Sequence, residues 1–252
     1  MRFAWLGSGS RGNAALVEAD GRCLMIDCGL GLKATETRLA RLGRTPADID
    51  AILVTHEHSD HLGGVARFAN RHGVRVLATP GTARGFRHGS PPQLEQISPH
   101  EPFVVGALEV APMPVPHDAH EPCQFVFSDG AHKLGIVTDL GHVTAHVVTS
   151  LQGCDALALE SNHDEAMLAN GPYSAHLRRR VGGQLGHLSN RQAAGLLSAL
   201  DTSRLQHFVA LHLSEINNTP ALAQAALADA LGCRPDEVDC AAQSDGLDWR
   251  SL

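Results

Sequence analysis

Three features are missing from the sequence, and each absence excludes a class of protein. No stretch approaches the roughly 20 apolar residues that a membrane-spanning helix needs. The apolar start is interrupted at Gly7-Ser8-Gly9-Ser10, too early for the apolar region of a secretory signal peptide. The cysteines form no Cys-x-x-Cys pair and no zinc-ribbon spacing, and most lie in apolar company. We therefore expect a cytoplasmic protein whose cysteines are small buried residues or free thiols.

Positive charge is also scarce. The chain has 20 Lys and Arg against 27 Asp and Glu, for a formal net charge of -7. Non-specific binding to nucleic acid depends mostly on Lys and Arg at phosphates, so this composition argues against a surface that coats nucleic acid, while a local basic patch is still allowed. Histidine, by contrast, is abundant, with 16 residues. An excess of His without an excess of Cys indicates metal binding or acid–base chemistry.

The histidines concentrate in one short segment. Residues 55–64 contain the pattern His-x-His-x-Asp-His. The apolar residues 51–54 predict a buried strand that ends at this segment, and residues 62–70 predict a helix that leaves it. The cluster is therefore expected on a strand-to-helix loop. A histidine-rich surface turn is the alternative, but such side chains suit the end of a buried strand only if something binds them.

The motif supplies four candidate metal ligands: His56, His58, Asp60 and His61. His56 and His58 are two apart in an extended segment, so their side chains project to the same side. Asp60 and His61 open the helix and are expected to turn toward a second point nearby. Imidazole and carboxylate together suit Zn²⁺, with Mn²⁺ or Fe²⁺ as alternatives. The spacing thus predicts a site for two metal ions.

Further polar residues follow apolar strands later in the chain: His117, Asp139 and His212. A strand-end histidine taken alone is more often bonded to backbone, but after the motif we expect each of these residues to be a ligand. Asp27 also ends an apolar strand, where it either caps the following turn or orients a metal-bound imidazole. We favour the orienting role.

The motif resembles the signature of the metallo-β-lactamase superfamily. The resemblance implies His56, His58 and His117 on one divalent ion, Asp60, His61 and His212 on a second, and Asp139 between them. It also implies an α/β fold of four layers (αββα), in which two mixed β-sheets are sandwiched between helices. We find no internal repeat or linker, so we expect a single domain over residues 1–252.

Two such ions hold a bridging water as hydroxide, the expected nucleophile, and neutralise charge on a phosphoryl or acyl oxygen. Asp60 takes part as a ligand. The leaving alkoxide needs a proton from a histidine that is not a ligand, and His187 is the candidate. In phosphodiesterases of this superfamily a histidine opens the helix before the strand that carries the last ligating histidine. Residues 186–190, the helix after them and His212 are similar to that arrangement.

Several segments resemble the YycJ/WalJ branch of the superfamily: residues 7–13, 52–61, 117–119, 160–164, 170–173, 186–190 and 212–218. This resemblance spans almost the whole chain and implies a cytoplasmic 5′-to-3′ DNA exonuclease, hence DNA or another phosphodiester as the partner and no membrane. The residues expected near the substrate are Ser10, Asn13, His163 and Tyr173.

Two other functions stay open at this point. A thioester or lactone hydrolase would make His187 dispensable, and a metal-stabilised binding module would need no catalytic histidine at all. For a DNA substrate, the arginines should converge on the mouth of the metal site. The candidates are Arg11, Arg84, Arg87 and Arg178 to Arg180, with His88 as a further candidate in the loop of residues 79–100. For Arg84, Arg87 and His88 we favour a solvated charged face over phosphate contact.

Overall fold

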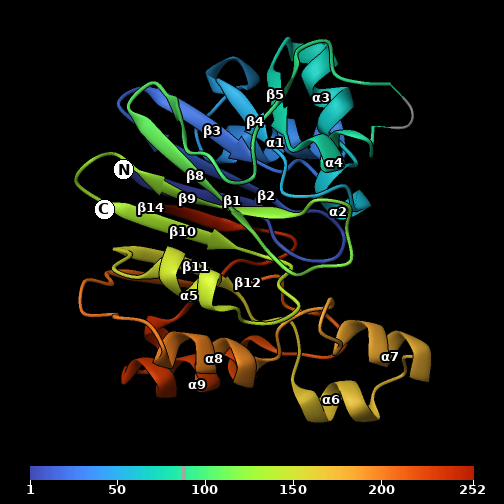
Figure 1. The fold of residues 1–252 in the computed structure, drawn as a ribbon, viewed down its shortest axis with the longest axis vertical. Helices are drawn as coiled ribbons and strands as arrows, with labels where there is room; N and C mark the ends of the chain where they lie inside the picture. The colour runs from blue at the N-terminus through green and yellow to red at the C-terminus, as the bar shows by residue number, and fades with distance from the viewer. Residues whose placement is uncertain (87–88) are drawn as a thin grey trace.

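The computed structural model describes residues 1–86 and 89–252, and within them the strands form two seven-stranded sheets (Figure 1). In spatial order the first sheet contains β14 (Leu247–Ser251), β1 (Arg2–Gly7), β2 (Ala14–Ala19), β3 (Arg22–Ile26), β4 (Ala51–Leu53), β5 (Arg75–Ala78) and β6 (Leu94–Gln96). The second contains β13 (Asp239–Cys240), β12 (His207–Leu211), β11 (Ala156–Glu160), β10 (Lys133–Val137), β9 (Cys123–Ser128), β8 (Leu108–Pro114) and β7 (Phe103–Val105).

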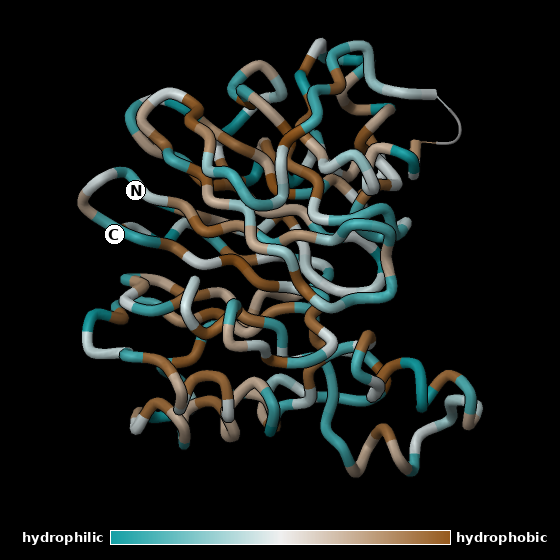
Figure 2. The backbone as a smooth tube through the Cα atoms, in the orientation of Figure 1, coloured by the Kyte–Doolittle hydropathy of each residue, from teal (hydrophilic) through white to brown (hydrophobic). Residues whose placement is uncertain are grey.

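The sheets pack face to face because their strands alternate buried side chains between two sides. Phe3 and Trp5 of β1 enter the core between the sheets, where they join Phe125 and Phe127 of β9. Ala4 and Leu6, which alternate with them along β1, face the outer core under the helices. Figure 2 shows hydrophobic stretches along the central strands and hydrophilic ones at the peripheral loops.

Helices cover both outer faces, which completes the predicted αββα layers (Figure 1). Those beside the first sheet are α1 (Leu32–Arg41), α2 (Ser59–Leu62), α3 (Val65–His72) and α4 (Pro80–Ala83), and the 3₁₀ turn η1 (Pro46–Asp48) precedes β4. Those beside the second are α5 (Ala145–Leu151), α8 (Asn190–Ser198) and α9 (Pro220–Leu231), and the 3₁₀ turn η2 (Pro235–Glu237) precedes β13. In Figure 1, α6 (Glu165–Asn170) and α7 (Ala175–Val181) project at the lower right, away from α8 and α9.

The strand directions decide where a site can form. β3, β4 and β5 are parallel neighbours in the first sheet, and β10, β11 and β12 are parallel neighbours in the second. Parallel strands deliver their carboxyl ends to one edge, and ligands bind in α/β proteins at such edges. Residues that follow β4, β10 and β12 therefore meet at one side of the sandwich.

Some local expectations need correction. The helix expected over residues 62–70 is two helices, because the chain turns at Gly63-Gly64, where the Gly64 N–H donates to the Cys28 carbonyl at 2.7 Å. The loop of residues 79–100 contains β6 besides the expected helical turn, and Arg87 and His88 lie outside the described residues. All six cysteines are free thiols, as expected. In the described ranges, no helix has the length and apolar character needed to cross a membrane.

Candidate metal centre

The predicted ligands meet at the edge where the strands end, although they come from both sheets. The motif follows β4, His117 follows β8, Asp139 follows β10 and His212 follows β12. Positive φ angles occur at Asp27 (60°), Asp139 (50°) and His212 (50°), each one or two residues after its strand. Such backbone costs about 1 to 3 kcal/mol for a non-glycine residue and collects at functional sites. The strained turns aim three strand-end side chains at one place.

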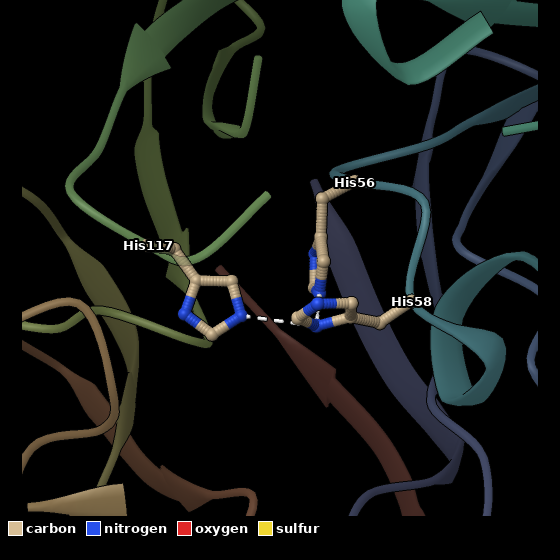
Figure 3. Close-up of side chains that lie close together, drawn as sticks. All are labelled: His56, His58 and His117. Atoms are coloured by element: carbon tan, nitrogen blue, oxygen red, sulfur yellow. Dashed lines mark hydrogen bonds between the residues drawn. The ribbon is translucent and has the colours of Figure 1, made fainter. Parts of the chain in front are cut away.

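The first group of donors is His56, His58 and His117 (Figure 3). His58 Nδ1 lies 3.1 Å from His56 Nε2 and 3.2 Å from His117 Nε2. His117 Nδ1 donates to the Gly186 carbonyl at 3.1 Å, so its Nε2 presents a lone pair to the cluster. Burial lowers the pKa of His117, and burial with the neighbouring His61 holds the pKa of His56 well below its ordinary value. The imidazoles of His56 and His117 are therefore neutral, as metal ligands must be.

The second group is Asp60, His61 and His212. Asp60 Oδ2 lies 3.4 Å from His61 Nε2 and 3.7 Å from His212 Nε2. Burial alone lowers the pKa of His61, but Asp139 and Asp27 outweigh it and raise that pKa well above its ordinary value. The carboxylates thus favour a positive charge at this group, as they would for a bound cation.

Asp139 connects the two groups. Its Oδ2 lies 3.0 Å from both His61 Nε2 and His212 Nδ1, and its Oδ1 lies 3.8 Å from His117 Nε2. Burial would raise the pKa of Asp139, but His212 and His61 hold it well below its usual range. An ionised carboxylate therefore stands between two sets of donors, in each of which the ligand atoms lie within 4.8 Å of one another. Clustered histidines and carboxylates of this kind suggest divalent metal binding.

Asp27 lies behind this cluster, in the orienting position expected for it. The His61 Nδ1–H donates to Asp27 Oδ2 at 2.7 Å, which turns His61 Nε2 toward Asp60 and Asp139. The Thr55 backbone N–H and hydroxyl donate to the same carboxylate, each at 2.8 Å. These bonds fix the carboxylate and, through it, the tautomer of the imidazole.

His187 stands beside the donors and is held by a carboxylate that the sequence analysis did not select. The His187 Nδ1–H donates to Glu160 Oε1 at 2.7 Å, and Asp139 Oδ1 lies 3.4 Å from the same nitrogen. Burial lowers the pKa of His187, but Glu160 and Asp139 outweigh it and raise that pKa to about 9. Glu160 also accepts from the backbone N–H groups of Leu140 and Leu188. The signal was present, since Glu160 ends an apolar strand just as Asp27 does.

A pocket of about 350 Å³ opens over the donors, and two of the four predicted substrate contacts line it, Ser10 and Tyr173. The other two, Asn13 and His163, are not part of its described wall, and their contact with substrate stays a prediction. Asn13 is buried among the ligands, with its Nδ2 3.1 Å from His61 Nε2 and 3.4 Å from Asp60 Oδ2. The side chain of His163 is also buried and is not part of the pocket wall.

The candidate arginines do not converge as a group. Of those described, only Arg180 lines the pocket, where Tyr173 and His187 are its neighbours in the wall. Arg11 forms an exposed ion pair with Glu215, and Arg178 Nη1 donates to the Ala169 carbonyl at 2.7 Å. Arg87 lies outside the described residues.

Comparison with known proteins identifies the class. Residues 22–212 match the Beta-lactamase superfamily domain. The chain also superposes on the metallo-beta-lactamase fold protein YhfI from Bacillus subtilis with a TM-score of 0.75 and 13% identity, covering 99% of this chain and 98% of that one. The protein therefore belongs to the metallo-β-lactamase superfamily and has its fold.

The comparisons also identify the branch. The chain is 34% identical over 235 residues to exodeoxyribonuclease YycJ of Bacillus anthracis, covering 92% of this chain and 89% of the relative. It is 31% identical over 239 residues to exodeoxyribonuclease WalJ of Streptococcus pneumoniae, covering 92% and 88%. Within the superfamily it belongs to the YycJ/WalJ-like branch, and it is a metal-dependent hydrolase.

Proposed function

We propose that this protein is a metal-dependent phosphodiesterase that degrades DNA as an exonuclease, from the 5′ end. The observation that carries this proposal is the Glu160–His187 pair beside the two groups of donors, because it supplies a proton donor that is separate from the metal ligands. The relatives that match nearly the whole chain are named exodeoxyribonucleases, and this supports DNA as the substrate.

The donor set fits two divalent ions, with Zn²⁺ preferred and Mn²⁺ or Fe²⁺ as alternatives. We assign His56, His58 and His117 to one ion, Asp60, His61 and His212 to the other, and Asp139 to both. When bound, such ions lower the pKa of water to form the nucleophile and neutralise charge on the phosphoryl oxygens. Asp27 holds the Nδ1 of His61, so that its Nε2 is directed into the site.

His187 carries out the proton transfer in this proposal. Its Nδ1–H is held by Glu160, and its pKa of about 9 keeps the ring protonated at neutral pH. The ring lies in the pocket wall, 21% exposed, and its other nitrogen is the atom from which the leaving oxygen takes its proton. A carboxylate that holds the donor imidazole in one tautomer contributes both to its orientation and to its charge.

The test measures hydrolysis of duplex DNA labelled at either end by protein loaded with Zn²⁺ or with Mn²⁺. We expect metal-dependent release of nucleotides from the 5′ end and a loss of about 10²- to 10⁴-fold in kcat for His187→Ala, with unchanged metal content. His146→Ala, in an exposed histidine of α5, is the matched control. If neither metal supports release while a thioester or lactone is hydrolysed equally by both proteins, the protein is a small-molecule hydrolase instead.

A further inference from the structure

One ion pair spans the pocket mouth and joins α7 to the metal centre. Arg180 Nε donates to Asp118 Oδ2 at 2.6 Å, and both residues line the pocket over the donors. Asp118 follows the ligand His117, while Arg180 ends the run of arginines in α7. The pair therefore connects the projecting helices to the second sheet at the opening through which a substrate enters.

The free oxygen of Asp118 lies against the first donor group. Asp118 Oδ1 is 3.6 Å from His58 Nε2 and 3.5 Å from His117 Nε2. The Asp118 backbone N–H donates to the Leu185 carbonyl at 3.0 Å, which anchors this residue to the loop that carries His187. One carboxylate thus places a negative charge between the guanidinium and the two imidazoles, where an anionic substrate group would lie.

Arg180 has capacity for a further partner. Its side chain is 55% exposed, and within the described residues its Nη1 and Nη2 have no hydrogen-bond acceptor. A pair this exposed contributes at most about 1 kcal/mol to stability, so holding the fold together does not explain it. Arg178 differs, because it donates to the end of α6 and so stabilises the helix pair.

The charged residues of the pocket wall are mainly acidic, so an anionic substrate needs the positive charge of Arg180. Asp60, Asp118 and Asp139 line it, and among its described lining residues Arg180 is the only Lys or Arg. A phosphate chain approaching three carboxylates in a protein of net charge -7 needs a fixed positive group besides the metal ions. A guanidinium fork binds phosphate through two parallel hydrogen bonds and keeps its charge at every working pH.

We propose that Arg180 is the phosphate-recognition residue of this site and that Asp118 is its exchangeable partner in the free protein. On binding, a phosphate of the nucleic-acid strand next to the scissile bond replaces Asp118 on Arg180. The pocket, at about 350 Å³, is at the small end of ligand sites and accepts one terminal nucleotide rather than a duplex. This inference rests on the proposed nuclease function and names the part of the substrate that the pocket reads.

The test compares Arg180→Gln with Arg179→Gln, its neighbour in α7, which is exposed and is not part of the described pocket wall. Single-stranded DNA and bis(p-nitrophenyl) phosphate, which has one phosphate, are the substrates. We expect KM for DNA to rise about 10- to 100-fold in Arg180→Gln, as loss of a hydrogen bond between charged groups predicts. The ratio of kcat/KM for DNA to that for the small diester should fall accordingly, and Arg179→Gln should leave it unchanged.

A binding measurement gives a readout that does not depend on turnover. The logarithm of the DNA association constant should fall less steeply with the logarithm of salt concentration in Arg180→Gln, by about 0.7, because one phosphate contact is lost. Strands with a 5′-phosphate and a 5′-hydroxyl identify the phosphate. Loss of a preference for the 5′-phosphate assigns Arg180 to the terminal group, and an equal loss on both strands assigns it to an internal diester.

Asp118→Asn tests the exchange. It should lower KM for DNA several-fold more when Arg180 is present than in the Arg180→Gln background, where only the loss of charge repulsion remains. The inference is wrong if Arg180→Gln lowers kcat/KM equally for DNA and for the small diester, or if Asp118→Asn acts alike in both backgrounds. Failure of the wild-type protein to cleave any DNA would instead overturn the nuclease function itself, so the two failures are distinguishable.

Discussion

The loop of residues 55–61 and the strand ends of the second sheet supply the same kinds of donor in opposite ways. The loop presents four of them within six residues, and their spacing alone sets which side chains share a side. The second sheet presents donors after β8, β10 and β12, at positions separated by tens of residues, and only the order and direction of its strands bring them together. A compact motif is therefore enough to predict a site, whereas the dispersed residues complete its donor set and include the proposed proton donor.

The largest effect is expected at Asp139, because this residue of the second sheet contacts both groups of donors. We expect Asp139→Asn to lower kcat on the order of 1,000-fold and to reduce the bound metal, because it removes several kcal/mol of charge stabilisation. Asn tolerates the positive φ at this position, so backbone strain is not added. Metal analysis and steady-state kinetics measure the effect. Asp129→Asn, in the β9–β10 hairpin, is the control, and retention of both metals in Asp139→Asn would show that the groups are independent.

Glu160→Gln tests the proposed proton donor, His187, without changing any of the proposed metal ligands. We expect kcat to fall up to about 100-fold, as for other residues that orient a catalytic group. Glu160 raises the pKa of His187, so the acid form is lost as pH rises through about 9. Without that charge the pKa falls, and the alkaline limb of the kcat profile moves to lower pH. An unchanged limb, with Glu165→Gln as control, would remove His187 from the role of acid.

Asp27→Asn is the matching change on the loop side. Asp27 holds His61 as Glu160 holds His187, but the His61 imidazole points to the other donors, whereas His187 lies in the pocket wall. We expect about tenfold weaker metal binding and no shift of the alkaline limb. Competition with a chelator measures the affinity. If Asp27→Asn moved the pH profile while metal affinity stayed constant, the assignment of metal binding to the Asp27–His61 pair and of proton transfer to the Glu160–His187 pair would be wrong.

The smallest effect concerns the contact between the sheet edges away from the site. Arg250 of β14 donates from Nε and Nη2 to the two oxygens of Asp239 in β13, each at 2.7 Å. The pair is partly exposed, so Arg250→Gln should lower the free energy of unfolding by only about 0.5 to 1 kcal/mol and leave kcat unchanged. Urea unfolding measures the first and DNA hydrolysis the second. A loss of activity would mean that this pair sets the relative position of the two donor groups.

The sequence predicted which donor side chains would gather, because they follow recognisable strands. The gathering of His56, His58 and His117, with Asp27 behind His61, is the arrangement expected from spacing and resemblance. Glu160 was missed because its role depends on the distance to His187, 27 residues further along the chain. Asn13 and His163 were expected near the substrate, and burial against neighbouring elements, which no local pattern shows, keeps both out of the described pocket wall.

The sequence by itself determined the class of fold and the donor chemistry, because strand periodicity and the residue types at the strand ends are local properties. Tertiary structure decided which carboxylate holds His187, which polar residues are buried rather than part of the pocket wall, and that Arg180 alone among the described candidate arginines lines the pocket. These depend on non-local packing. Two sheets must close on a shared apolar core before groups from distant strands can come within hydrogen-bonding distance.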